Sequence, residues 1–280
     1  MSAAARDIGI GQPAVSERID RLEAHLGTSL LRRNTRSISV TDIGARFYER
    51  CKLAIEAADD ALAGVHEDMP LRGILRIAAP HGVGEVVLSP ILLSLRNHHP
   101  QLKIDLVLND RIVDPVSEGV DISFRLGDHG EGNFVARRLG HVRRVLVASP
   151  AYLDRHGIPA KPDDLIEHPF ARVSGLFNNS RLPLLSADQR TVLAPIDIAL
   201  SVSHWRSLHA LLLGGAGLGV LQEPVCTEEL GNGRLIRLLS EFVVPGFEFH
   251  ALYPANKPVP PRIRMVLSLL EELLPSILTG

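Results

Sequence analysis

The chain is poor in cysteine and in long apolar runs. Its 280 residues contain only Cys51 and Cys226, which lie far apart and form no CxxC pair. We therefore expect neither a disulfide framework nor a zinc knuckle, and a buried free thiol is the expected state of each cysteine, with a redox sensor as the alternative. No apolar run approaches the roughly eighteen residues of a membrane helix, and no apolar signal-peptide core is seen. A cytoplasmic protein is expected.

Sequence motifs of common enzymes are also missing. There is no GxSxG, no HExxH and no carboxylate pair that periodicity brings together. Residues 9–14 fit a dinucleotide-binding fingerprint only superficially, because Pro13 stands where a phosphate-binding N–H is needed. Residues 214–219 are rich in glycine but lead from a helix into a strand, the reverse of a phosphate loop. We therefore expect no enzyme, no cofactor, and neither catalytic nor metal-binding residues.

Charge is low overall and uneven along the chain. The formal net charge is −2 at pH 7, which argues against a protein that coats nucleic acid without sequence preference. Arg32, Arg33 and Arg36 nevertheless lie in a window, residues 28–41, that holds no acidic residue. A positive excess confined to one region suits site-specific DNA binding with a salt-sensitive phosphate component.

Residues 12–26 have the pattern of an amphipathic helix. Pro13 is tolerated in a first turn, where its missing N–H has no helical partner, and Gly27 is placed to end the helix. The apolar stripe expected to face a small core is Val15, Ile19, Leu22 and Leu26. A small-residue run at residues 3–5 and a turn at Gly9 precede it, so the segment predicts a helix-turn-helix. The alternative is an ordinary amphipathic helix with a solvated arginine face.

The polar faces of this helix carry side chains that can read DNA. In a helix-turn-helix, the first residues of the second helix meet base edges, while neighbouring groups hold phosphates. Gln12 can pair with adenine, Arg18 with guanine, and Ser16 with a base or a phosphate. Beyond the helix, Ile38 and Val40 alternate with serines, which indicates a short strand in a basic wing. The expected DNA-binding residues are Gln12, Pro13, Ala14, Ser16, Arg18, Arg21, Arg32, Arg33 and Arg36.

The same segment resembles the DNA-binding domain of the LysR-type transcriptional regulators. The family's motifs occur in order and without a gap. They are Ala4-Ala5-Arg6, residues 12–16, Arg21-Leu22-Glu23, Leu26-Gly27 and Val40-Thr41 up to Gly44. The similarity continues through residues 71–77 and 135–157 and so covers essentially the whole chain. The resemblance implies a winged helix-turn-helix domain in a ligand-responsive bacterial gene regulator.

The resemblance also implies a first helix that packs against the helix-turn-helix. The chain begins at Met1 without residues for that helix, so we expect a DNA-binding domain that is incomplete at its N-terminus. One alternative is a regulator impaired in DNA binding that keeps effector binding and dimerisation. A solute-binding protein is a second alternative, but it would not carry the pattern of residues 12–36.

A long helix with one apolar seam is predicted from residue 42 to about residue 67. The seam is Ile43, Phe47, Cys51, Ile55, Ala58, Leu62 and Val65. Such a helix between two domains usually needs a partner to cover its seam. The resemblance implies a linker that pairs with its twin in a homodimer or homotetramer, and packing on its own C-terminal domain is the alternative. The expected domains are residues 1–41, 42–70 and 71–280.

Strand-like and helix-like segments alternate after Gly73, which argues for an α/β fold with mostly parallel sheets. Strands are expected at residues 75–79, 103–108, 121–125, 143–148, 196–202, 218–221 and 247–253. Helices are expected at residues 85–99, 113–119, 150–156, 205–213 and 262–278. The resemblance implies a two-lobed effector domain like a periplasmic binding protein, with lobes at about 72–147 plus 248–280, and 148–247.

Loops after the strands of this domain form the candidate effector site, because ligands of open α/β sheets lie beyond the carboxyl ends of the strands. The expected site residues are Pro80, His81, Gly82, Asn109, Asp110, Phe124, Arg125, Ser203, His204 and Trp205. Histidine and arginine side chains and the N–H groups at a helix start can bind an anion, and Trp205 can stack on a ring of the ligand. The alternative is that each arginine pairs with an acid and Trp205 packs between the lobes. The expected partners are promoter DNA, a small effector (an organic acid, from the family's usual range) and a second copy of the chain, but no membrane.

Overall fold

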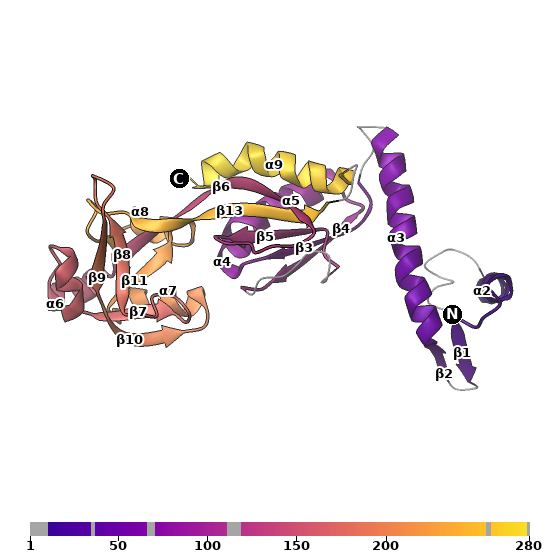
Figure 1. Ribbon diagram of the computed structural model, residues 1–280, viewed down its shortest axis with the longest axis horizontal. Coiled ribbons are helices and arrows are strands. Elements are labelled where there is room, and N and C mark those ends of the chain that lie inside the picture. The colour runs from indigo at the N-terminus through magenta and orange to yellow at the C-terminus, as the bar shows by residue number, and fades with distance from the viewer. Residues whose placement is uncertain (1–10, 35–36, 66–70, 111–118, 256–258, 279–280) are drawn as a thin grey trace. The chain divides into compact units, whose positions relative to one another are not determined.

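The computed structural model describes residues 11–34, 37–65, 71–110, 119–255 and 259–278. The chain divides into two compact units, residues 1–67 and residues 68–280, and each is considered by itself (Figure 1). The predicted turn at Gly9, Arg36 and most of the helix expected at 113–119 lie outside the described residues. Within the described part, no helix is both long enough and apolar enough to span a membrane.

The described part of the first unit is a helix, a two-stranded wing and a long helix. The elements are α2 (Gln12–Leu26), β1 (Leu31–Asn34), β2 (Ser37–Val40) and α3 (Asp42–Val65). The predicted helix at 12–26 is confirmed with its expected ends: Pro13 lies in the first turn, and Gly27 caps the helix with a φ of 66°. The predicted wing is confirmed as well, since β1 and β2 pair antiparallel, with Arg33 opposite Ile38.

Two contacts connect the wing to the helices of this unit. The backbone N–H groups of Leu30 and Leu31 donate to Glu23 Oε1 at 2.6 and 2.9 Å, so one carboxylate of α2 orients the start of the wing. Thr41 Oγ1 accepts from the Gly44 N–H at 2.9 Å and caps α3. A Cβ at Gly44 would lie 2.1 Å from the Leu30 carbonyl oxygen, so only glycine fits where α3 passes the wing.

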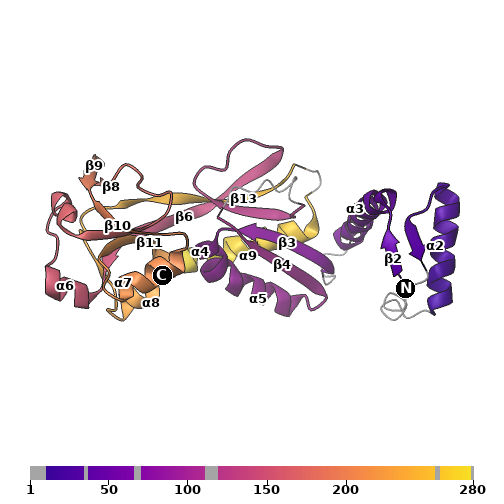
Figure 2. The ribbon, with the colours of Figure 1, turned by 90° about the horizontal axis from the view of Figure 1, so that it is seen from below.

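The described residues of the second unit form a nine-stranded sheet shared by two lobes. Its order is β10 (Asp197–Val202), β7 (Pro169–Val173), β11 (Leu218–Gln222), β6 (Phe134–Ala148), β13 (Val244–Pro254), β5 (Ile122–Leu126), β3 (Gly73–Ala79) and β4 (Leu102–Leu108), with β12 (Ile236–Arg237) also pairing with β6. We call the part built on parallel β3, β4 and β5 lobe I, and the part built on parallel β7, β10 and β11 lobe II. Antiparallel β6 and β13 run through both lobes (Figures 1 and 2).

Helices cover the lobes much as the alternating pattern predicts. They are α4 (His81–Val83), α5 (Ser89–His98), α6 (Pro150–His156), α7 (Trp205–Leu213), α8 (Thr227–Gly231) and α9 (Pro261–Leu278). The predictions for α6 and α7 are confirmed to the residue. The apolar face of α9 packs into the lobe I core through Ile263, Leu267 and Leu270, beside β6 and β13 in both views (Figures 1 and 2).

The structure corrects three expectations in this unit. The strand expected at 143–148 begins at Phe134, because its polar first half pairs with β13. The helix expected at 85–99 is instead a helical run from His81, with a π-helical turn at Gly84–Leu88, where Pro90 has no N–H to continue the regular bonding. The hairpin of β8 (Arg181–Leu185) and β9 (Thr191–Pro195) was not expected at all.

Candidate DNA-binding and ligand-binding sites

Most of the expected DNA-reading side chains of α2 lie on its open faces. Gln12, Pro13 and Arg18 are exposed and Ser16 is half-buried, while Val15, one turn from both Gln12 and Arg18, is buried. Arg21 is also exposed, and its guanidinium pairs with Glu17 at 2.6 Å. A surface pair of this kind is worth little, so it leaves the arginine available to a phosphate. These exposed side chains are open to a DNA groove, and their contacts with DNA stay predictions.

The wing carries the remaining expected contacts. Arg32 is exposed on β1. The side chain of Arg33 and the whole of Arg36 lie outside the described residues. Ala14, the last expected position, is half-buried in the first turn of α2. The structure thus shows Arg32 open to solvent on the wing, and the phosphate contacts of all three arginines stay predictions.

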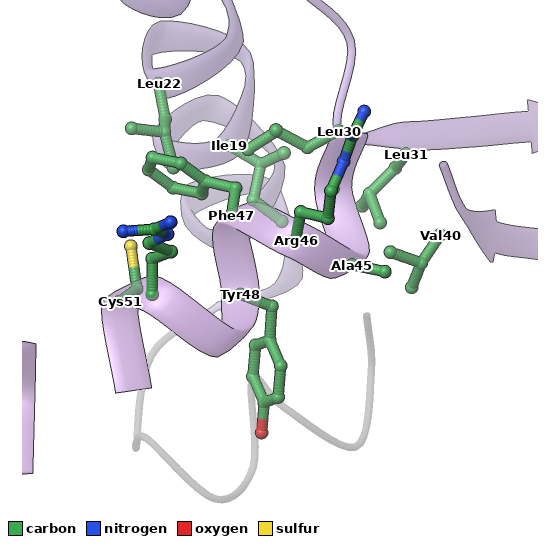
Figure 3. Close-up of a pocket in the computed structure, with 12 residues that line it drawn as sticks. Ile19, Leu22, Leu30, Leu31, Val40, Ala45, Arg46, Phe47, Tyr48 and Cys51 are labelled. Atoms are coloured by element: carbon green, nitrogen blue, oxygen red, sulfur yellow. The ribbon is translucent and has the colours of Figure 1, made fainter. Parts of the chain in front are cut away.

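An apolar groove lies between α2 and α3 in the first unit. Its volume is about 1010 Å³, and Ile19 and Leu22 of α2 line it together with Phe47 and Cys51 of α3 (Figure 3). Leu22 and Leu26 of the predicted apolar stripe are more than a third exposed. The described residues therefore cover the stripe only in part, at the Val15 end.

The loops expected to meet at the ligand site do meet across the two lobes. The imidazole rings of His81 in lobe I and His204 in lobe II lie 4.3 Å apart, centroid to centroid. Asp110 Oδ1 accepts from the backbone N–H of His81 at 3.0 Å, which joins the second expected loop to the first. A Cβ at Gly82 would lie 2.8 Å from Gln222 Oε1 of lobe II. The carboxyl ends of β3 and β11 are therefore in contact.

Two of the expected effector residues face the interior. Phe124 is fully buried in the lobe I core and stacks on Phe249 at 5.7 Å, so it supports the site from behind and cannot line it. Arg125 is also almost fully buried. Sequence pattern did not separate these residues from the open loops, because strand β5 is buried on both faces.

The expected residues of the open loops in both lobes divide by exposure. Ser203 and Asp110 are exposed, whereas Pro80, Asn109 and His204 are half-buried. Trp205 packs partly into the lobe II core and carries the Arg206 guanidinium 4.9 Å above its ring. The sequence left open packing of Trp205 between the lobes as the alternative to ligand binding, and the structure places the ring against the lobe II core.

Glu85 is a site residue that the sequence analysis missed. Its Oε2 accepts from Arg206 Nε at 2.6 Å, so this ion pair joins lobe I to lobe II. Its Oε1 lies 3.5 Å from His81 Nδ1 and 3.8 Å from His204 Nε2. The i, i+4 spacing of His81 and Glu85 at the start of a helical run was the available signal.

Arg144, which was not among the expected residues, lies on β6 in lobe II, opposite Gln222 of β11. Its guanidinium lies 4.2 Å from the Phe247 ring centroid and 5.5 Å from that of Phe177, and its Nε donates to the Pro245 carbonyl. Among the described residues no carboxylate pairs with it. Burial lowers the pKa of Arg144 to about 10, which still leaves it charged at pH 7.

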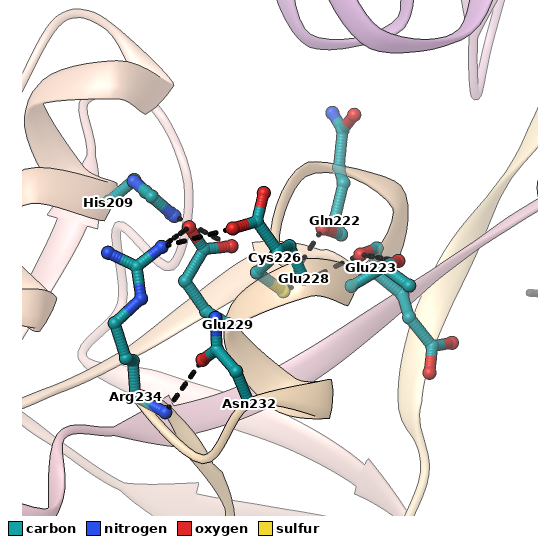
Figure 4. Close-up of polar contacts among 9 residues, drawn as sticks. His209, Gln222, Glu223, Cys226, Glu228, Glu229, Asn232 and Arg234 are labelled. Carbon is teal, nitrogen blue, oxygen red and sulfur yellow. Dashed lines mark hydrogen bonds and ion pairs between the residues drawn. The ribbon is translucent and has the colours of Figure 1, made fainter.

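A polar cluster borders a separate cavity beside α7 and α8. Glu229 pairs with Arg234 at 2.9 Å and with His209 at 3.4 Å (Figure 4). The cavity measures about 500 Å³, and Val86 of lobe I and Trp205 line it along with His209. Because Glu229 already has two partners, we interpret the cluster as one that stabilises the fold and not as a binding site.

Cys226 lies buried beneath the same cluster. Burial, followed by the charges of Glu223 and Glu229, raises the pKa of its thiol to about 12. A redox sensor needs an accessible thiolate. The structure therefore confirms a buried free thiol at Cys226, while Cys51 is half-exposed in the groove of the first unit.

A winged helix-turn-helix unit joined to a two-lobed α/β unit defines a ligand-responsive DNA-binding regulator. Residues 1–45 match the bacterial regulatory helix-turn-helix protein of the lysR family, and residues 69–275 match the LysR substrate binding domain. The chain belongs to this family: it is a LysR-type DNA-binding transcriptional regulator with an effector-binding domain. The presence of both domains argues against a solute-binding protein.

Named relatives agree with this assignment. The chain is 30% identical to the HTH-type transcriptional regulator DmlR of Escherichia coli K12, covering 97% of this chain and 88% of DmlR. It is 31% identical to the uncharacterized HTH-type transcriptional regulator YhjC of the same strain, covering 98% and 92%. Among solved structures, CrgA, a LysR-type transcriptional regulator from Neisseria meningitidis, superposes with a TM-score of 0.65 at 29% identity and coverages of 96% and 92%.

Proposed function

We propose that α2 reads operator DNA through Gln12, Ser16 and Arg18, and that the basic wing holds flanking phosphates. The observation that carries this proposal is the exposure of Gln12 and Arg18, which lie one turn before and one turn after buried Val15 on α2. Arginine in a major groove pairs bidentately with guanine and so supplies discrimination, whereas wing arginines supply charge without sequence preference. Arg33 and Arg36 are proposed as phosphate contacts together with Arg32, and Pro13 and Ala14 as close contacts at the helix start.

Fluorescence anisotropy tests this division of labour, using a duplex selected from a random-sequence library and a scrambled duplex at several salt concentrations. Arg18→Ala should lower the preference for the selected duplex by roughly 5- to 150-fold. Arg32→Ala should weaken both duplexes alike and reduce the salt slope by about one. Arg190→Ala, on the exposed β8–β9 hairpin, is the matched control. Unchanged discrimination in Arg18→Ala would contradict the proposal.

We infer that the ends of the lobes that meet at His81 and His204 bind a small organic acid as effector. Ser203 is exposed just before α7, and Arg144 is a charged group without a carboxylate partner among the described residues. Pro80, Gly82, Asn109, Asp110 and Trp205 complete the proposed surroundings, with Phe124 and Arg125 behind them. A ligand that prefers one arrangement of the lobes shifts their populations and so couples to DNA binding.

Isothermal titration with a panel of aliphatic and aromatic carboxylates tests the effector site. An acid that binds the full chain should bind at least about tenfold more weakly to Arg144→Gln, because a charged hydrogen bond is worth about 1.5–3 kcal/mol. Equal affinity for every binding acid in Arg144→Gln and in Ser203→Ala would overturn the proposed position of the site. Arg181→Gln, another lobe II arginine, is the control.

We also propose that α3 pairs with α3 of a second copy in a homodimer or homotetramer, with the helix acting as the linker of residues 42–70. Tyr48 and Ile55, two turns apart on α3, are both more than 60% exposed, which supports a covering partner. Sedimentation velocity of Ile55→Asp should show a shift to monomer, while Arg46→Asp, at an exposed position of α3 outside the predicted seam, serves as the control for altered charge. A regulator of this kind acts in the cytoplasm and without catalysis.

A further inference from the structure

Three side chains that commonly bind metal ions meet where the two lobes touch. His81 and Glu85 come from lobe I, and His204 comes from lobe II. Each offers one ligand atom, and these atoms all lie within 4.8 Å of one another. Because His204 is more than a hundred residues from His81 and Glu85 in the chain and lies in the other lobe, only the folded second unit assembles the set.

Distances within the set are close to those of a coordinated ion. Glu85 Oε1 lies 3.5 Å from His81 Nδ1 and 3.8 Å from His204 Nε2. Zinc holds nitrogen and oxygen ligands at about 2.0–2.2 Å, so neighbouring ligand atoms in a tetrahedral site are about 3.4 Å apart. The distances from Glu85 Oε1 to the two imidazole nitrogens thus need to shorten by only a few tenths of an ångström for all three atoms to bind one ion.

His81 supplies the second observation. Its Nδ1 is buried and has no hydrogen-bond partner among the described residues, although Glu85 Oε1 is nearby. Buried polar atoms are nearly always paired, because an unpaired one has lost its hydration without compensation. A metal ion placed between His81 and Glu85 would satisfy this lone pair directly.

Arg206 contacts the other two residues of the set and orients the Glu85 carboxylate. Its Nε donates to Glu85 Oε2 at 2.6 Å, which leaves Oε1 toward the imidazoles, and its backbone N–H donates to His204 Nδ1 at 3.1 Å. Outer contacts of this kind are usual for ligating carboxylates. Coordination through His204 Nε2 moves the ring proton to Nδ1 and ends the helix-cap bond, a loss of about fivefold in affinity. That factor is small beside the gain from three ligands.

We propose that a divalent transition-metal ion, of the zinc, cobalt or nickel class, binds His81, Glu85 and His204 and joins the two lobes. Two imidazoles and one carboxylate select these ions over magnesium and calcium, which prefer all-oxygen ligands. The protein leaves at least one coordination position for water or for an oxygen of a second ligand. The inference rests on the proposed effector role of the same cleft and deepens it by naming one class of ligand.

Titration of the metal-free full chain with zinc chloride tests the site without DNA and without an organic acid. We expect one zinc per chain with a micromolar or lower Kd, and no binding of magnesium. Glu85→Gln and His204→Ala should each weaken zinc binding by more than about 100-fold, beyond the 10- to 100-fold typical of outer contacts. His98→Ala, an exposed histidine at the end of α5, should leave the Kd unchanged.

Cobalt substitution adds a spectroscopic readout that a fold defect does not mimic. Bound Co²⁺ should show the visible absorption bands that are typical of cobalt with few ligands. These bands should be lost in a His204→Ala variant whose circular dichroism spectrum matches that of the wild-type chain. The absence of zinc binding by the wild-type chain, or equal zinc affinity in wild type, Glu85→Gln and His204→Ala, would overturn the proposal. Neither result would contradict the proposals on DNA binding and carboxylate binding, because separate experiments measure those.

Discussion

Removing the Glu23 carboxylate should release the wing from the recognition helix. Glu23 Oε1 accepts from the N–H groups of Leu30 and Leu31 at 2.6 and 2.9 Å. A hydrogen bond to a charged group contributes about 1.5–3 kcal/mol when buried. Both bonds are only partly buried, so water replaces part of each, and we expect a loss of about 2–3 kcal/mol in local stability for Glu23→Ala.

Hydrogen exchange of the wing measures this loss directly, because a chain with two units has no single unfolding transition. The expected 2–3 kcal/mol corresponds to roughly 30- to 150-fold faster exchange in peptides from residues 28–34 and 37–41. Glu17→Ala is the matched control, since Glu17 lies on the same helix and makes only an exposed pair with Arg21. Equal exchange of the wing in the two variants would refute the reasoning.

Three further predictions concern the second unit. Gly217→Ala should lower its melting temperature markedly, because the new Cβ would lie 2.1 Å from the Pro169 carbonyl oxygen at a φ of 137°; a wild-type melting curve would contradict this. Cys226, whose pKa burial raises to about 12, should resist iodoacetamide at pH 8 until the unit unfolds. Hydrogen bonding from Arg138 lowers the pKa of Glu248 to about 2, so this carboxylate should stay charged at pH 4. Its contribution to the stability of the folded unit should be lost as the pH falls toward 2. In Arg138→Gln, an NMR titration of Glu248 should move its midpoint upward.

Local signals predicted several elements to the residue. The ends of α2 follow from Pro13 in its first turn and Gly27 after it, and both act within a few residues of the helix they bound. The same holds for α6, which begins at Pro150. Elements that depend on contacts with residues far away in the chain were predicted less well. The β8–β9 hairpin contains Pro183 and Pro195, which argue against strands in a sequence but are tolerated in an isolated two-stranded sheet.

Strand β6, which runs through both lobes, also depends on a partner that is distant in the chain. The first half of β6 carries Arg137 and Arg138 and does not look like a buried strand. It extends because β13, more than a hundred residues later, supplies a partner for its backbone and because Glu248 pairs with Arg138. Pairing across such a separation leaves no trace in local periodicity.

The sequence by itself determined the class of protein, the amphipathic helix α2 and most helix ends, because each rests on residues that are neighbours in the chain. Only the tertiary structure decided what stands at the ligand cleft. Phe124 and Arg125 turned inward because β5 is covered on both faces, while Glu85 and Arg206 came together across the lobes. The proposed metal site has the same origin, because its ligands come from both lobes and only the fold of the second unit brings them together.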